Sequence, residues 1–233
     1  MNFFYAPPEN WNENRTVVEI TNQEAIHISK VLRNKIGDLI YVADGNGNRS
    51  KCEIIDVSKK SIRLKVLETQ SEKEPALKKV MAFGAIKKRD RLEFAIEKAI
   101  ELDAWEICVF DADHSEWSRL NEERIQTQIV SAFKQSGRFF LPKLVVKKSL
   151  EEVLTHYKDH SILMAYLGEE EAGIPDQLTE AENLFLVGPE GGFSKREADL
   201  AKAKGAKFIT LGKNRLRAET AVVAFLSQFL FSK

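Results

Sequence analysis

Apolar runs of strand length alternate with amphipathic helical segments after residue 75, and this alternation constrains the fold more than any other feature. The runs are almost continuous in valine, isoleucine, leucine and phenylalanine, as parallel strands covered by helices on both faces require. The expected strands are Val80–Ile86, Ile107–Phe110, Ile162–Tyr166, Leu184–Val187 and Phe208–Leu211, and the expected helices are Leu92–Leu102, Asn121–Gln135, Leu150–Tyr157, Lys195–Lys204 and Glu219–Leu230. The pattern predicts an α/β domain with a parallel sheet over residues 76–233.

The first seventy residues have a different pattern, with short alternating strands and one helix. Asp44-Gly45 and Asn46-Gly47 are typical of a hairpin turn, and Thr21 with Glu24 fits a capping box that opens a helix through Leu32. The expected strands are Asn2–Tyr5, Thr16–Ile20, Leu39–Ala43, Ser50–Val57 and Ser61–Glu68. Residues 1–70 therefore predict a small β-barrel domain, and the polar segment Thr69–Pro75 predicts the linker.

Composition excludes several classes of protein. No apolar run approaches the ~20 residues needed to cross a bilayer, and the N-terminus does not resemble a signal peptide, so we expect a cytoplasmic protein with no membrane association. Cys52 and Cys108 lie in apolar runs and predict reduced core thiols. The four histidines are scattered without metal-ligand spacing, so we expect no metal.

Charge is balanced overall but unevenly distributed. The formal net charge is zero, yet residues 78–91 hold six basic side chains against one acid, and residues 134–148 hold five basic side chains and no acid. Such segregation fits an ordinary solvated surface, and it fits a local phosphate-binding face equally well. Candidate phosphate contacts are Lys87, Lys88, Lys134 and Lys143 in these stretches, together with Arg33 in the first domain.

Glycine-rich segments follow the expected strands where a parallel sheet binds its ligands, beyond the carboxyl ends of the strands. Gly188, Gly191 and Gly192 surround Pro189, and the other two segments end at Gly168 and Gly212. A tight turn explains such glycines, but their density favours backbone wrapped over a ligand. Because the motif is neither a P-loop nor a dinucleotide fingerprint, a phosphate-free adenosine ligand fits best.

The segment Lys213–Thr220 leads from the last expected strand into a very apolar helix. Glu219 suits the positive end of that helix, so its position needs no further explanation. Arg217 is electrostatically misplaced there unless it serves an anion. Arg217 is therefore a functional candidate.

The motifs around these residues resemble those of a known family. Gly188-Pro189-Glu190-Gly191-Gly192-Phe193-Ser194, followed by Leu211-Gly212-Lys213-Asn214-Arg215-Leu216-Arg217-Ala218-Glu219-Thr220-Ala221, is similar to the paired motifs of the RsmE family of 16S rRNA uracil-N3 methyltransferases, within the SPOUT class. Supporting matches are Lys30–Arg33, Arg91–Glu93, Lys98–Leu102 and Lys134–Arg138. The resemblance covers essentially the whole chain.

The resemblance implies a PUA-like RNA-binding barrel at 1–70 and a SPOUT methyltransferase domain with a trefoil knot at 76–233. It further implies a homodimer that binds S-adenosylmethionine (SAM) and acts on 16S rRNA in the 30S subunit. The implied cofactor-binding residues are Leu167, Gly168, Gly188, Pro189, Glu190, Gly191, Gly192, Leu211, Gly212, Leu216, Arg217 and Ala218.

Methylation of uridine N3 requires that the proton on N3 leave, so the enzyme must stabilise an anionic base or accept the proton. The catalytic candidates are Arg217 first and Arg138 second for the anion, and Glu219 for the proton. Three alternatives stay open: a SPOUT methyltransferase acting on a different RNA, a non-catalytic RNA-binding protein, and a nucleotide-dependent oxidoreductase. The last should carry a glycine fingerprint after its first strand, where only Gly84 occurs.

Overall fold

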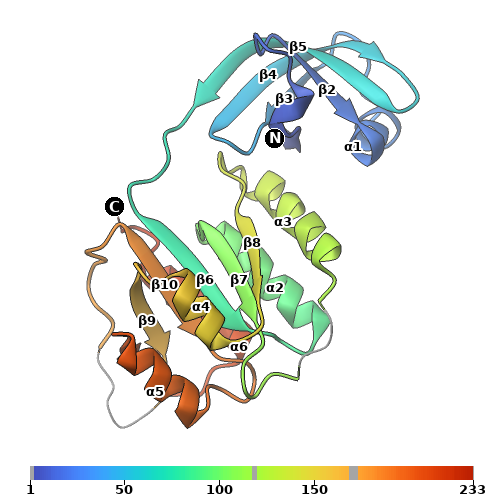
Figure 1. Cartoon of the computed structure of the whole chain (residues 1–233). Coiled ribbons are helices and arrows are strands. Elements are labelled where there is room, and N and C mark those ends of the chain that lie inside the picture. The colour runs from blue at the N-terminus through green and yellow to red at the C-terminus, as the bar shows by residue number, and fades with distance from the viewer. Residues whose placement is uncertain (1–2, 117–119, 168–172, 233) are drawn as a thin grey trace. The chain divides into compact units, whose positions relative to one another are not determined.

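The computed structural model describes residues 3–116, 120–167 and 173–232 (Figure 1). The chain forms two compact units, one from Met1–Glu74 with Val130–Leu141 and the other from Pro75–Ile129 with Pro142–Lys233. Each unit has its own sheet and its own core. Among the described residues no helix is long and apolar enough to cross a membrane.

A five-stranded mixed sheet forms the first unit, in the order β1-β3-β4-β5-β2. β1 and β3 are parallel, and the other neighbouring pairs are antiparallel. Alternate side chains such as Phe4, Val42 and Leu64 form its buried core. The strands are β1 (Phe3–Tyr5), β2 (Val17–Thr21), β3 (Leu39–Ala43), β4 (Asn48–Val57) and β5 (Ser61–Ser71).

Two local predictions in this unit were wrong. Thr21 makes no side-chain capping bond at α1 (Asn22–Ile26), where Asn22 adopts a φ of +58° and its backbone N–H donates to Lys60 O at 2.9 Å. α1 continues as a π-helical turn over His27–Val31. The predicted linker starts too early, since β5 runs to Ser71 and pairs with β4 over Thr69–Ser71.

A later segment of the chain completes the first unit. Val130–Leu141 returns to it, and the Lys134 ammonium donates to both carboxylate oxygens of Glu24 at 2.9 Å. The Gly47 N–H donates to Phe139 O at 3.0 Å, and Phe133 packs edge-on against Tyr5 with ring centroids 5.8 Å apart. The sequence-based limits of 1–70 and 76–233 do not include this return.

The second unit contains a six-stranded sheet in the order β11-β9-β10-β6-β7-β8, with every neighbouring pair parallel. The predicted α/β class is confirmed. Its strands are β6 (Lys78–Gly84), β7 (Glu106–Phe110), β8 (Lys143–Lys147), β9 (Ser161–Ala165), β10 (Glu182–Val187) and β11 (Lys207–Ile209). The sequence analysis missed β8, an edge strand only half-buried and bounded by lysines.

Helices cover both faces of this sheet (Figure 1). On one face, α2 (Arg89–Glu101) packs with α6 (Ala218–Gln228), whose Phe225 stacks on Phe185 of β10 at 4.7 Å. On the other, α4 (Leu150–His156) and α5 (Lys195–Ala203) cover the core that includes Leu184 and Leu186. α3 (Glu122–Ser136) contains the boundary between the units.

Both cysteines are buried and unpaired, Cys52 in the first unit and Cys108 in the second, as predicted. Burial raises the pKa of each thiol to about 12. A thiol in such surroundings stays protonated at neutral pH and is a poor nucleophile. The two cysteines are therefore core residues.

Candidate functional site

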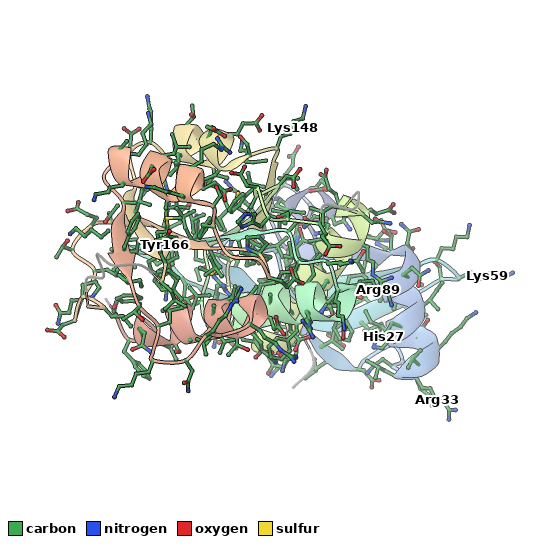
Figure 2. The ribbon with its side chains drawn as sticks, turned by 90° about the horizontal axis from the view of Figure 1, so that it is seen from below. His27, Arg33, Lys59, Arg89, Lys148 and Tyr166 are labelled. Carbon is green, nitrogen blue, oxygen red and sulfur yellow. The ribbon has the colours of Figure 1, made fainter. Side chains whose placement is uncertain are left out.

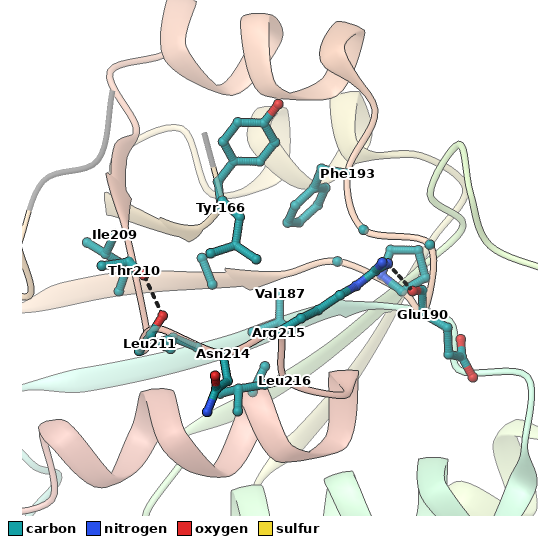
Figure 3. A pocket seen from close by; sticks show the side chains of 18 residues that line it. Tyr166, Val187, Glu190, Phe193, Ile209, Thr210, Leu211, Asn214, Arg215 and Leu216 are labelled. Atoms are coloured by element: carbon teal, nitrogen blue, oxygen red, sulfur yellow. Dashed lines mark hydrogen bonds between the residues drawn. The ribbon is translucent and has the colours of Figure 1, made fainter. Parts of the chain in front are cut away.

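A cavity of about 370 Å³ lies beyond the carboxyl ends of β9, β10 and β11 (Figure 3). Most of the residues expected to bind a cofactor line it: Leu167, Gly188, Pro189, Glu190, Gly191, Gly192, Leu211, Gly212 and Leu216. Arg217 and Ala218 are not among the lining residues. Gly168 lies outside the described residues. The prediction that these segments converge on one pocket agrees with this arrangement.

Apolar side chains form much of the cavity wall. Figure 3 shows Tyr166 and Phe193 on one side, with Leu216 and Asn214 opposite, nearer α6. The sequence analysis did not select the remaining lining residues, which are Ala165, Tyr166, Val187, Phe193, Ile209, Thr210, Asn214, Arg215 and Ala221. Apolar walls with exposed backbone polar groups suit a planar heterocycle such as adenine.

The glycine segment is shaped by close backbone approaches. A Cβ on Gly188 would lie 2.9 Å from Gly192 C, and a Cβ on Gly84 would lie 2.6 Å from Pro189 Cδ. Gly191 faces His114, whose Cβ would be 2.7 Å away, so a side chain there meets protein before it meets a ligand. Gly192 has a φ of +75°, and within the described residues no atom beyond its two chain neighbours lies within 4 Å of its Cβ position. No side chain therefore covers the Gly192 backbone where it lines the cavity.

A buried carboxylate holds this segment in place. Glu197 of α5 is 1% exposed and accepts hydrogen bonds from the backbone N–H groups of Ser194 at 2.9 Å and Asp113 at 3.1 Å. Ser194 Oγ accepts in turn from Glu197 N at 3.1 Å, which completes a capping box. This Ser-x-x-Glu pattern is visible in the sequence, so the capping box could have been predicted from it.

Charged groups surround the same junction. Arg196 donates to both carboxylate oxygens of Asp113, and its other guanidinium nitrogen donates to Glu151 of α4. These bonds, together with one from Ser194 Oγ, hold the pKa of the Asp113 carboxyl below its ordinary value. The loop after β7 and the start of α5 are thereby tied together beside the glycine segment.

Glu197→Ala is expected to lower the free energy of unfolding by about 2 to 3 kcal/mol, because two backbone donors lose a buried charged acceptor. Urea unfolding of the two proteins measures this. Asp199→Ala is the matched control, since Asp199 is an exposed acid on the same helix whose pairing with the exposed Lys195 is screened by solvent and stabilises the fold little. Equal losses in both variants would contradict a supporting role for Glu197.

Arg215 spans one side of the cavity and was not selected from the sequence. Its guanidinium donates to the backbone carbonyl of Glu190 at 3.2 Å, as the dashed line in Figure 3 shows. The Glu190 carboxylate accepts from Lys87 N at 3.3 Å. Two cavity segments and the loop after β6 are thus connected. In this loop the sequence pattern indicated Arg217 and not Arg215 as the functional candidate.

Arg217 and Glu219 lie at the start of α6. Arg217 is the exposed residue preceding the helix, and its side chain makes no capping hydrogen bond. Glu219 is buried, with Oε1 3.5 Å from Arg91 Nε of α2. The other oxygen, Oε2, is buried with no hydrogen-bond partner among the described residues.

The remaining candidates lie in both units. Arg138 belongs to the segment that completes the first unit, where Gly137 before it has a φ of +65°. Arg33 is exposed in the first unit, and Figure 2 shows it pointing away from the ribbon. Lys87, Lys88 and Lys143 are exposed in the second unit, where Lys87 pairs with Glu116. Lys134 is already neutralised by Glu24. No cluster of His, Cys, Asp and Glu suited to a metal occurs in the described ranges.

Two family models match the chain. An RNA methyltransferase domain matches residues 73–230, and an RNA methyltransferase PUA domain matches residues 20–67. The chain is 30% identical over 220 residues to ribosomal RNA small subunit methyltransferase E of Rickettsia conorii, covering 91% of this chain and 88% of that protein. It is 29% identical over 230 residues to the protein of the same name from Bacillus subtilis, covering 92% and 90%.

Solved structures are also similar over nearly the whole chain. Ribosomal RNA small subunit methyltransferase E from Neisseria gonorrhoeae, bound to S-adenosyl methionine, has a TM-score of 0.84 at 25% identity and covers 97% of this chain and 95% of its own. A probable rRNA-methyltransferase from Porphyromonas gingivalis has a TM-score of 0.84 at 29% identity, with coverage of 97% and 96%.

Proposed function

Because the chain belongs to the RNA methyltransferase family, whose matching curated members are named ribosomal RNA small subunit methyltransferase E, we propose that it methylates RNA of the small ribosomal subunit with SAM as methyl donor. The observation that carries the proposal is the cavity beyond β9, β10 and β11. A protein that only binds RNA has no use for such a cavity. The similar Neisseria gonorrhoeae protein binds S-adenosyl methionine.

The lining residues fit this cofactor. Bare backbone at Gly192 and Gly212, where within the described residues no atom beyond the chain neighbours lies within 4 Å of either Cβ position, leaves room for close approach of a ligand. Tyr166, Phe193 and Leu216 provide apolar surface for an adenine ring, and backbone groups of the glycine segment provide hydrogen bonds to its edge. Arg215 supplies a cation at the cavity wall for a carboxylate.

The proposed substrate is a uridine of 16S rRNA, methylated at N3 in the 30S subunit. We further infer that the enzyme is a cytoplasmic homodimer, that its second domain is knotted, and that 1–70 and 76–233 make up most of its two domains. These finer statements follow the motifs Gly188–Ser194 and Leu211–Ala221. The first domain would hold RNA, with Arg33 as its exposed candidate contact.

Bound SAM supplies an electrophilic methyl group, and the chain supplies positioning and charge. An exposed guanidinium at Arg217, with Arg138 second, can stabilise the negative charge left on a uracil that has lost its N3 proton. Glu219 is the candidate acceptor of that proton, since Oε2 has no hydrogen-bond partner in the described part of the chain. Arg91, 3.5 Å from Oε1, holds the Glu219 carboxylate in place.

Ala221→Leu tests the cavity assignment. Ala221 lines the cavity from α6, so a leucine would occupy space that the cofactor needs without disturbing helix propensity. We expect SAM affinity, measured by isothermal titration, to fall at least tenfold, about 1.4 kcal/mol. Methyl transfer to 30S subunits at limiting SAM should fall in parallel.

Ala224→Leu is the control, because Ala224 lies on the same helix but not among the lining residues. It should bind SAM as the parent protein does. Unchanged affinity in the Ala221 variant would refute the cavity assignment. A parent protein that binds SAM but transfers no methyl group to 30S subunits would refute the proposed substrate.

A further inference from the structure

A row of chemically unusual side chains crosses four neighbouring strands of the first unit. Phe3 of β1 pairs with Tyr41 of β3, Tyr41 with Lys51 of β4, and Lys51 with Glu68 of β5. Two residues away from Lys51 and Glu68 along the same two strands, Arg49 pairs with Gln70. Pairing places these side chains on one face of the sheet, since alternate residues of a strand point to opposite faces. We call these six residues the aromatic-cation row.

The row lies on the opposite face from the core of its unit. The neighbours of its members along the strands, Phe4, Val42 and Cys52, are buried in that core. The six residues together line a cavity of about 270 Å³. Phe3, Tyr41 and Lys51 are only half-buried, and Glu68 and Gln70 are exposed. Aromatic rings on the outer face of a sheet gain little from folding, because they remain partly in water.

Packing holds Arg49 in a fixed position. Its guanidinium carbon lies 3.4 Å from the ring centroid of Phe139 and 5.1 Å from that of Phe3. Phe3 in turn packs edge-on against Tyr41, with centroids 5.9 Å apart. The Lys51 ammonium has no ion-pair partner within 4.0 Å among the residues described, although Glu68 pairs with Lys51 across the strands. The row therefore combines ordered aromatic surface with an unneutralised cation.

We propose that the aromatic-cation row binds one unpaired nucleotide of the RNA substrate. The base would stack on Tyr41 beside Phe3, as bases splayed out of single-stranded RNA stack on aromatic side chains. Lys51 and Arg49 would contact the phosphate. This inference rests on the proposed function, because it assumes that the substrate is RNA.

Glu68 sets the orientation of the nucleotide. A carboxylate repels phosphate, so the backbone of the RNA must run at the Lys51 and Arg49 part of the row. The strand order places Lys51 and Arg49 between Tyr41 and the acidic Glu68, so the base lies on the Tyr41 side of the phosphate. The row thus separates a phosphate position from a base position within one cavity.

The test uses the full chain and a fluorescein-labelled single-stranded RNA of eight uridines. Tyr41→Ala should raise the dissociation constant roughly 5- to 150-fold, as loss of one stacked base does, whereas Tyr41→Phe should keep near-parent affinity. Lys51→Ala should raise it several-fold and reduce the slope of log affinity against log salt by about one. For 30S subunits, both alanine variants should raise KM with kcat unchanged.

Lys59→Ala is the matched control, because it removes the same charge from an exposed lysine of the same unit that is outside the row; Figure 2 shows Lys59 pointing into solvent. It should leave affinity and salt slope as in the parent. If Tyr41→Ala is unfolded by circular dichroism, Lys51→Ala decides, since no hydrogen bond or ion pair in the described structure depends on its side chain.

The outcomes separate this inference from the proposed function. Unchanged oligonucleotide binding in Tyr41→Ala and Lys51→Ala would overturn the aromatic-cation row as a nucleotide site, even if the parent methylates 30S subunits. Loss of binding in these variants, with Lys59→Ala normal, would support it. A parent that fails to methylate 30S subunits counts against the proposed function alone, because the oligonucleotide measurement needs no methyl transfer.

Discussion

Arg217→Ala is expected to lower the single-turnover rate of methyl transfer by a factor on the order of a hundred to a thousand, the usual effect of removing one donor that stabilises a developing anion. Arg217 is exposed at the N-terminus of α6, where the helix dipole disfavours a cation. It directly follows Leu216, which lines the cavity. An anionic target explains a guanidinium in this position.

Single-turnover kinetics with saturating SAM and 30S subunits isolate the chemical step from product release. Arg217→Lys should recover only part of the rate, because an ammonium keeps the charge but lacks the planar fork. Lys213→Ala is the matched control, an exposed cation of the same loop that does not line the cavity. Parent-like turnover in Arg217→Ala would eliminate the proposed role, whereas lost SAM binding would reassign Arg217 to the cofactor site.

A chain reduced to residues 76–233 is expected to aggregate and to lose methyl transfer to 30S subunits completely. The reduced chain still contains Val130–Leu141, whose Phe133 and Phe139 are 1% and 8% exposed in the first unit. Removing Tyr5 and Arg49 takes away the groups that pack against these rings. Aromatic side chains bury about 150 to 250 Å² each, so their exposure creates an apolar surface that promotes aggregation.

Sedimentation velocity and SAM titration of the reduced chain measure this effect. Replacing Phe133 and Phe139 by serine in the reduced chain should restore much of its solubility, which identifies the exposed rings as the cause. The same two replacements in the full chain should instead destabilise it, by about 3 to 5 kcal/mol for each aromatic removed from a core. A soluble reduced chain that binds SAM as the parent does would show that Val130–Leu141 needs no partner.

The parts of the fold that could be predicted are those with local signals. Continuous apolar runs such as Leu184–Val187 identify buried parallel strands, and Gly188–Gly192 identifies a ligand loop, because both patterns act within a few residues. β8 was not predicted because half-burial at a sheet edge leaves no continuous apolar run. The Thr21 capping box did not form, and at this position Asn22 has a φ of +58° and donates its backbone N–H to Lys60 O, neither of which the local pattern indicates.

The parts that could not be predicted depend on long-range pairing. The aromatic-cation row exists only because strand register aligns Phe3, Tyr41 and Lys51, residues that share no local pattern. The link between Arg215 and Glu190, and that between Glu197 and Asp113, likewise join segments far apart in sequence. For the site, therefore, sequence motifs identify the loops that line the cavity, and tertiary structure identifies what supports them.

The return of Val130–Leu141 to the first unit also determines when that unit can be completed during synthesis of the chain. Translation adds about 5 to 20 residues per second, and the 67 residues from Glu74 to Leu141 (141 − 74) therefore take roughly 3 to 13 s to make. For most of that interval the first unit lacks Phe133 and Phe139, while β6, α2 and β7 of the second unit are already being made. The N-terminal unit therefore stays incomplete until a segment that lies within the sequence of the second unit has been made.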